Sequence, residues 1–260
     1  MGMHRADTHD ESPDTGWRIT EIGQAQVRSE AGAWLLTANP TPADQYSDAQ
    51  ISDYVTDDFR WTPPLRMTVT ASLTPAAPAL RGTAGFGFWN QPFMPGQVRL
   101  RLPQAIWFFF SAAPSNINLA QGVPGPGWKT ATINARRWQF LALAPAAPLG
   151  VLLMRVPALY QRLWPVGQRA IGVSEHLLDH DLLTETHTYT LDWRADGAAF
   201  AVDGKTVHEA PVTPGGPLGF VAWVDNQYAI VTPQGQFGFG TVPLPQAQTL
   251  RLDAIRIEPQ

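Results

Sequence analysis

Apolar and polar residues alternate along much of the chain, which is the pattern of strands with one buried face. The alternation is clearest at residues 187–210, where three apolar residues alternate with three polar ones: Tyr189, Leu191 and Trp193 with Thr190, Asp192 and Arg194. Asp196-Gly197 and Asp203-Gly204 interrupt this pattern, and Asp-Gly pairs are typical of tight hairpin turns. The stretch therefore predicts a three-stranded antiparallel meander.

Other apolar segments, separated by joints rich in Gly and Pro, predict further strands. They are Leu65–Leu73, Gly85–Trp89, Gln97–Leu102, Ala105–Ser111, Ala131–Asn134, Leu218–Val224 and Leu250–Ile257. The run AIWFFFS has no polar alternation, so we expect it to be buried on both faces or to line an apolar cavity. Many short strands with turn residues between them predict an all-β fold, a two-sheet antiparallel jelly-roll sandwich.

Residues 145–172 depart from the strand pattern and predict a helical insertion near the middle of the chain. Apolar residues recur at spacings of three and four and form one helical stripe: Leu152, Val156, Leu159, Leu163, Val166 and Ala170. Arg155, Arg162 and Arg169 follow one edge of it, and we expect Pro157 and Pro165 to split or kink the helix. Three roles stay open: a lid over an apolar pocket, a basic segment on a membrane surface, or plain packing.

Composition limits the possible domain organisation, chemistry and location of the protein. The 260 residues include 22 Gly, 24 Pro, ten Trp and no Cys, and only 15% are charged. We expect residues 1–15 to be a disordered tail and residues 16–260 to form a single domain. The absence of Cys excludes disulfides and a thiolate nucleophile. The polar N-terminus lacks the apolar segment of a signal peptide, which favours a cytoplasmic location.

The chain resembles glycoside hydrolase family 16 at three motifs: HTYTLDWRADGAAFAVDG, LRLDAIRIE and, more weakly, GTAGFGFWNQPF. The resemblance implies a concanavalin A-like jelly roll. It also implies a catalytic strand of the form E-x-D-x-(x)-E ahead of the meander, whose outer carboxylates act as nucleophile and acid/base. Residues 61–174 contain no Asp or Glu at all. No catalytic residue is therefore carried over from the family, and a conventional family 16 glycosidase is not expected.

Two clusters of aromatic and neutral polar residues are candidates for a binding site, since rings stack on a ligand while amides and hydroxyls bind its oxygens. The predicted ligand-binding residues are Trp89, Asn90, Trp107, Phe109, Ser111, Asn116, Trp223, Asp225, Asn226 and Tyr228. The alternative is that the Asn residues shape loops and the Phe residues form core. Candidate catalytic residues are Asp225, His176 and His180, and the two His would share a face if their segment were helical.

The sequence favours a small-molecule-binding jelly roll that holds a largely apolar ligand with neutral oxygens under a helical lid. Such a protein could act as a non-hydrolytic enzyme of the cyclase or isomerase type. The alternative is a lectin-like carbohydrate-binding module or a divergent glycoside hydrolase. We expect no cofactor and no metal centre, although carboxylates such as Asp53, Asp57 and Asp58 leave room for a structural Ca²⁺. The net charge of −4 gives no footprint for nucleic acid, and a membrane surface is not favoured as a partner.

Overall fold

The computed structural model describes residues 16–76, 79–92 and 101–260. The predicted tail at residues 1–15 lies outside the described residues, as does most of the strand predicted at Gln97–Leu102. The last two residues of that predicted strand, Arg101 and Leu102, belong to no strand in the structure.

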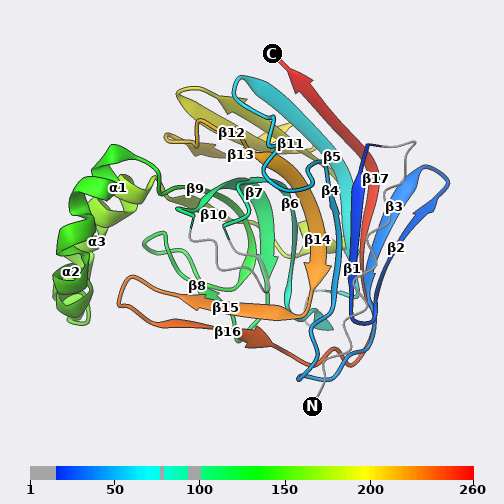
Figure 1. Cartoon of the computed structure of the whole chain (residues 1–260), viewed down its shortest axis with the longest axis horizontal. Helices are drawn as coiled ribbons and strands as arrows, with labels where there is room; N and C mark the ends of the chain where they lie inside the picture. The colour runs from blue at the N-terminus through cyan, green and yellow to red at the C-terminus, as the bar shows by residue number, and fades with distance from the viewer. Residues whose placement is uncertain (1–15, 77–78, 93–100) are drawn as a thin grey trace.

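Two antiparallel sheets of seven strands form the sandwich, as the sequence predicts (Figure 1). Sheet A has the order β1 (Arg18–Ile22), β4 (Asp48–Ser52), β14 (Gly219–Asp225), β6 (Thr83–Trp89), β7 (Gln104–Ser111), β9 (Gly127–Asn134) and β10 (Ser174–Leu177). Sheet B has the order β13 (Lys205–Ala210), β12 (Gly197–Val202), β11 (His187–Arg194), β5 (Leu65–Thr74), β17 (Gln248–Pro259), β3 (Ala33–Ala38) and β2 (Ala25–Glu30). The predicted meander is β11–β12–β13.

Aromatic side chains from both sheets fill the space between them. Phe108 on β7 lies 5.0 Å from Tyr189 on β11 and 5.3 Å from Phe200 on β12, measured between ring centroids. Phe88 on β6 contacts Trp193 in the same way at 5.4 Å. Side chains alternate along a strand, so the residues before and after each inward-pointing ring of sheet A point to the outer face of that sheet, away from the core.

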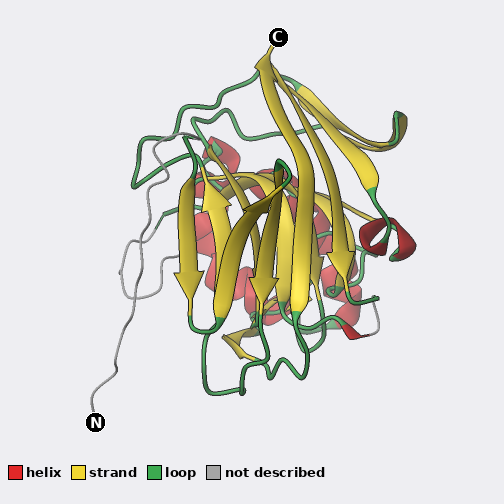
Figure 2. Cartoon of the chain, turned by 90° about the vertical axis from the view of Figure 1, so that its right-hand side faces the viewer, coloured by secondary structure: helices red, strands yellow, loops and turns green. Residues whose placement is uncertain are grey.

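A small third sheet and a helical unit lie beside the sandwich. The small sheet has the order β16 (Phe237–Thr241), β15 (Gln227–Val231) and β8 (Asn116–Ile117). The helical unit, residues 138–171, consists of α1 (Trp138–Leu143), a 3₁₀ turn (Ala144–Ala146), α2 (Ala147–Leu153) and α3 (Pro157–Ile171). It connects β9 to β10, which pair antiparallel. Figure 2 shows sheet B in front and the helices behind it.

The helical insertion is present but begins earlier than predicted, at Trp138. Pro165 lies inside helix α3 and does not split it. Pro157 does split the segment, since it is the first residue of α3, where its missing N–H removes no helical hydrogen bond. No helix among the described residues is long and apolar enough to cross a membrane.

The apolar stripe of the insertion is mostly exposed, which disfavours plain packing, one of the three roles that the sequence leaves open. Leu152, Val156, Leu163 and Val166 are all exposed, whereas α3 buries Trp164 and Ala170. Trp164 donates a hydrogen bond from Nε1 to the Leu119 carbonyl at 2.8 Å, and Gln168 accepts one from the Gln121 backbone N–H. Hydrogen bonds to a loop therefore determine which face of α3 is buried. The periodicity of apolar residues in the sequence does not reveal such contacts.

Candidate functional site

The outer face of sheet A, turned away from sheet B, carries the candidate site. On β14, Phe220, Ala222 and Val224 point into the core, so Val221, Trp223 and Asp225 point outward. The same alternation on β7 sends Trp107, Phe109 and Ser111 outward. The run AIWFFFS is thus buried on its inner face and lines an aromatic surface on its outer face.

Six aromatic residues from neighbouring segments gather on this outer face. This aromatic cluster consists of Tyr54, Phe59, Trp89, Trp107, Phe109 and Trp223. Trp89 and Trp223 are stacked, with 6.5 Å between ring centroids and 10° between ring planes. Trp107 lies 5.4 Å from both Phe109 and Trp223. Trp89 and Trp107 are partly exposed, so the cluster presents ring surface to solvent.

Two glycines on β6 make room for these rings. A Cβ at Gly85 would lie 2.9 Å from Cη2 of Trp223, and one at Gly87 would lie 2.6 Å from Cβ of Trp107. Both distances are too short for a side chain to be added without movement. The pattern GFGFW therefore has inward Phe rings and outward gaps, into which the rings of the neighbouring strands fit.

Neutral polar groups border the cluster. Trp89 donates its indole N–H to the Tyr54 hydroxyl, and Trp223 donates to Thr83 Oγ1 at 2.9 Å. Trp107 Nε1 has no hydrogen-bond acceptor among the described residues, and it is partly exposed. Gln50 on β4 is also partly exposed and lies directly opposite Trp223. These two groups are free to make directed hydrogen bonds with a neutral ligand.

The outer face also carries two adjacent carboxyl groups, but both are buried. Asp225 on β14 pairs in register with Asp48 on β4. Asp225 Oδ1 accepts hydrogen bonds from the N–H and hydroxyl of Thr83, at 3.0 and 2.8 Å, and from the Gln227 N–H at 3.0 Å. Burial raises the pKa of Asp225 to about 6. Burial, and then the charge of Asp225, raise the pKa of Asp48 well above its usual range, while Tyr46 hydrogen-bonds the carboxylate.

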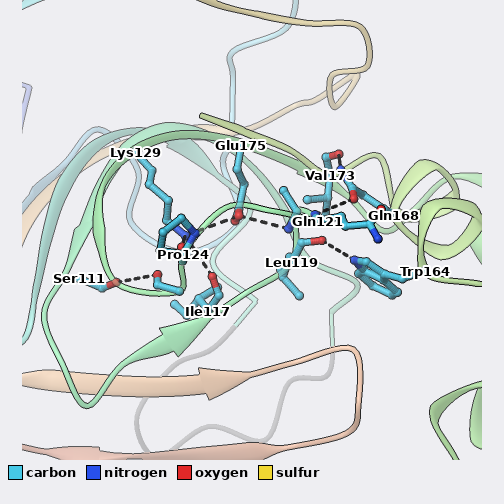
Figure 3. A network of polar contacts seen from close by, with 12 residues as sticks. Ser111, Ile117, Leu119, Gln121, Pro124, Lys129, Trp164, Gln168, Val173 and Glu175 are labelled. Carbon is cyan, nitrogen blue, oxygen red and sulfur yellow. Dashed lines mark hydrogen bonds and ion pairs between the residues drawn. The ribbon is translucent and has the colours of Figure 1, made fainter. Parts of the chain in front are cut away.

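A buried ion pair holds a loop over the far end of the same face (Figure 3). Lys129 Nζ on β9 lies 3.5 Å from Glu175 Oε2 on β10, and it donates to the carbonyls of Ile117 and Pro124. The Ala120 N–H donates to the same Glu175 oxygen at 3.2 Å. Burial lowers the pKa of Lys129 and raises that of Glu175, so for both groups lost hydration outweighs the mutual attraction.

The three candidate catalytic residues are not brought together. His176 is on β10, a strand rather than a helix, and its ring stacks on His208 at 5.5 Å. His208 accepts or donates a bond with Ser174 Oγ at 2.9 Å, and burial lowers its pKa to about 4. His180 lies edge-on to Phe110. No contact among the described residues links either His176 or His180 to Asp225.

The remaining predicted ligand-binding residues hold loops or lie beyond the cluster. Asn90 donates to the Leu102 carbonyl and accepts from the Gln104 N–H. Asn226 is fully buried and bonds the backbone of Gln45, Ser47 and Val242. Ser111 is buried, and Asn116 and Tyr228 belong to the small sheet. For Asn90 and Asn226 the loop-shaping interpretation of the sequence fits the contacts.

Three residues of the site were not among the predicted binding residues. Tyr54 and Phe59 complete the aromatic cluster, and Gln50 borders it. The segment SDAQIS alternates: Ala49 and Ile51 are buried in the core, whereas Asp48 and Gln50 point outward. This alternation is the signal in the sequence that could have identified Gln50. The turn that brings Phe59 to the cluster has no comparable pattern.

The comparisons with known proteins agree with this architecture. No family model matches the chain, and no curated protein matches its sequence. An endo-acting O-glycanase of the human gut microbiota matches 95% of this chain and 93% of its own, with 14% identity and a TM-score of 0.51. A pseudo β-1,3-glucanase of Mycobacterium tuberculosis matches 95% and 92%, with 10% identity and a TM-score of 0.50. The fold is a concanavalin A-like jelly roll. It resembles that of family 16, and the likeness extends to fold alone.

Proposed function

We propose that this jelly roll binds neutral glycans on the aromatic cluster and does not hydrolyse them. The observation that carries the proposal is the set of partly exposed indole rings at the centre of the outer face of sheet A, where Trp107 and Gln50 offer neutral polar groups. Flat aromatic rings stack on the apolar face of a sugar, while amide and indole groups bind its hydroxyls. The solved structures named above as a glycanase and a pseudo glucanase share this architecture.

The arrangement of carboxyl groups supports binding without hydrolysis. Retaining enzymes place two carboxyl groups about 5–5.5 Å apart and inverting enzymes about 6.5–9.5 Å apart, on either side of the bond to be cut. Asp48 and Asp225 are neighbours, but both are buried and Asp225 is occupied by Thr83 and Gln227. Glu175 is four strands from Asp225 in sheet A, roughly 19 Å at about 4.8 Å per strand.

The lidded-pocket interpretation has less support. The helical unit contributes no residue to the aromatic cluster among the described residues, and its contacts are with the loop at Leu119 and Gln121. A hollow of about 450 Å³ does touch the helical unit, but it is lined by Arg155 and Gln234–Gln236. It therefore lies apart from the aromatic cluster, and nothing in its lining favours cyclisation or isomerisation.

Calorimetric titration with neutral oligosaccharides tests the proposal. The panel contains β-1,3- and β-1,4-linked glucose oligomers, and each mixture is also assayed for new reducing ends. We expect binding without release of reducing ends. Trp107→Ala should weaken binding at least tenfold, about 1.4 kcal/mol, because it removes both a stacking surface and an indole donor.

A matched change elsewhere provides the control. Trp138→Ala removes an equally large, exposed ring from the helical unit and should leave glycan affinity unchanged. Equal effects of the two substitutions would contradict the proposed location of the site. Binding of apolar polycyclic compounds in place of every oligosaccharide would contradict the proposed ligand class, and steady release of reducing ends would revive the divergent hydrolase.

A further inference from the structure

Among the residues that the structure describes, most of the exposed large apolar side chains belong to two neighbouring segments. Trp138, Leu149 and Leu152 of the helical unit are 72%, 61% and 59% exposed. Phe237 and Phe239 of β16 are 71% and 76% exposed. Soluble proteins rarely expose apolar residues in such continuous groups, and those that do usually use them for contact with a protein or a membrane.

The two segments, residues 138–171 and 227–241, are together called the protrusion. Figure 1 shows the β15–β16 hairpin extending toward the helices. A Cβ at Gly235 in the hairpin turn would lie 2.5 Å from Cγ1 of Val151 in α2. Arg155 and the hairpin turn also line a common hollow. The rings of Phe237 and Phe239 are 6.0 Å apart on β16, an edge strand of the small sheet.

Internal packing does not account for this apolar surface. Neither α1 nor α2 contains a buried residue, and the two buried residues of α3 are Trp164 and Ala170. Helices this short are marginal alone in water and normally gain their stability by burying an apolar face. The faces of α1 and α2 are thus ones that a further surface would cover.

The charges of the protrusion indicate which surface that is. Residues 136–173 contain five Arg and no Asp or Glu, and the hairpin at residues 227–241 contains no charged residue. Arg155 and Arg162 form no ion pair among the described residues. Exposed apolar residues that include a Trp, together with two arginines that have no ion-pair partner among the described residues, are the composition of segments that lie in the interface of an anionic membrane.

We propose that the helical unit and β16 together form a docking surface for an anionic lipid bilayer. The apolar side chains enter the boundary between headgroups and acyl chains, and the arginines bind lipid phosphates. The surface lies on the membrane rather than through it, since none of the described helices is long and apolar enough to span one. This inference is independent of the glycan proposal, because no described residue is shared between the protrusion and the aromatic cluster.

Vesicle sedimentation of the full chain tests the charge requirement. We expect binding to vesicles of phosphatidylcholine with 30% phosphatidylglycerol, at least about tenfold weaker binding to phosphatidylcholine alone, and loss of binding at high salt. Arg155→Gln with Arg162→Gln should lower the partition coefficient about tenfold or more. The matched control, Arg194→Gln with Arg256→Gln, changes two exposed arginines of sheet B and should have little effect.

Site-specific labelling tests the location, since the chain has no native Cys. Leu152→Cys and Phe239→Cys carry a polarity-sensitive fluorophore, and Val55→Cys, at an exposed apolar position outside the protrusion, is the control. Anionic vesicles should shift the emission of the first two to the blue and leave the third unchanged. Trp107→Ala should bind vesicles like the unaltered protein, which separates this test from the glycan test.

Three results would overturn the proposal. The first is the absence of sedimentation with anionic vesicles, and the second is an equal emission shift at Val55. The third is self-association of the lipid-free protein that by itself shifts the emission at Leu152 and Phe239, because a second copy of the chain would then cover the surface.

Discussion

Sheet A and the helical unit both contain aromatic and basic side chains, but these are packed and paired in sheet A and exposed in the helical unit. In sheet A, aromatic rings from adjacent strands contact one another, and Lys129 is paired with Glu175 inside the protein. In the helical unit, Trp138 and Leu152 are exposed, and Arg162 forms no ion pair among the described residues. Aromatic and basic side chains therefore stabilise the fold in sheet A, whereas those of the helical unit are exposed and available for contact with a partner.

The difference has a simple topological origin. Every strand of sheet A except those at its edges has two hydrogen-bonded neighbours, and its inner face also meets sheet B. The helical unit is inserted in the connection between β9 and β10 and contacts the rest mainly through α3. An insertion of this kind is free to keep an uncovered apolar face without loss of the sandwich. Its side chains are consequently expected to influence binding more than stability.

The largest predicted effect compares one tryptophan from each region. Trp193→Ala should lower the free energy of unfolding by about 4–5 kcal/mol, since the ring is fully buried and its Nε1 donates to the Pro214 carbonyl. Trp138→Ala should change it by less than about 0.5 kcal/mol. Chemical denaturation of both variants checks the contrast. A similar loss for Trp138→Ala would mean that the helical unit contributes to the core after all.

A second prediction compares charges in the two regions. Glu175→Gln should lower the free energy of unfolding by about 3 kcal/mol, because it leaves Lys129 buried and uncompensated. Arg162→Gln should have almost no effect, since this side chain is exposed. The double variant Lys129→Met with Glu175→Leu should recover most of the loss, because it removes both charges together. Failure of the double variant to recover would assign the loss to the loop contact at Ala120 rather than to charge.

The sandwich could be predicted from the sequence because its signals are local. Asp-Gly turns and strict alternation define β11, β12 and β13, and the buried run AIWFFFS defines β7. In each of these segments, the local sequence favours the same secondary structure that the segment adopts in the fold. The resemblance to family 16 added the way in which the strands are arranged, and the solved structures agree with it.

The site was predictable only in part, because register and loop contacts are not local. Trp89, Trp107 and Trp223 were predicted as binding residues, but only the pairing of β14, β6 and β7 brings them together. The pairing of β14 with β4 places Asp48 beside Asp225, a neighbour 177 positions away that no spacing reveals. The sequence leaves the role of the helical stripe open for a related reason: periodicity shows that a helix is amphipathic but not what covers its apolar face.

The smallest predicted effect concerns the pH dependence of stability and rests on the two buried carboxyl groups of sheet A, Asp48 and Asp225. Burial raises the pKa of Asp48 and Asp225, so the folded protein holds protons that the unfolded chain releases above about pH 4. The contribution of Asp225 to stability is therefore fully present at acid pH and is lost as pH rises through about 6, its folded pKa, and the contribution of Asp48 is lost in the same direction.

Asp48→Asn removes one of these two carboxyl groups and should remove part of that loss. We expect the variant to be more stable than the unaltered protein by about 1–2 kcal/mol at pH 7.5 and nearly equal to it at pH 4, where the buried carboxyl is protonated. His208, with a pKa lowered to about 4, adds the opposite slope to both proteins, so the difference between their denaturation free energies isolates Asp48. Asp196→Asn, the same change at an exposed turn, is the control for the effect of the substitution itself. A difference for Asp48→Asn that does not vary with pH would contradict the prediction, because it would show that the Asp48 carboxyl is not protonated in the folded sheet A.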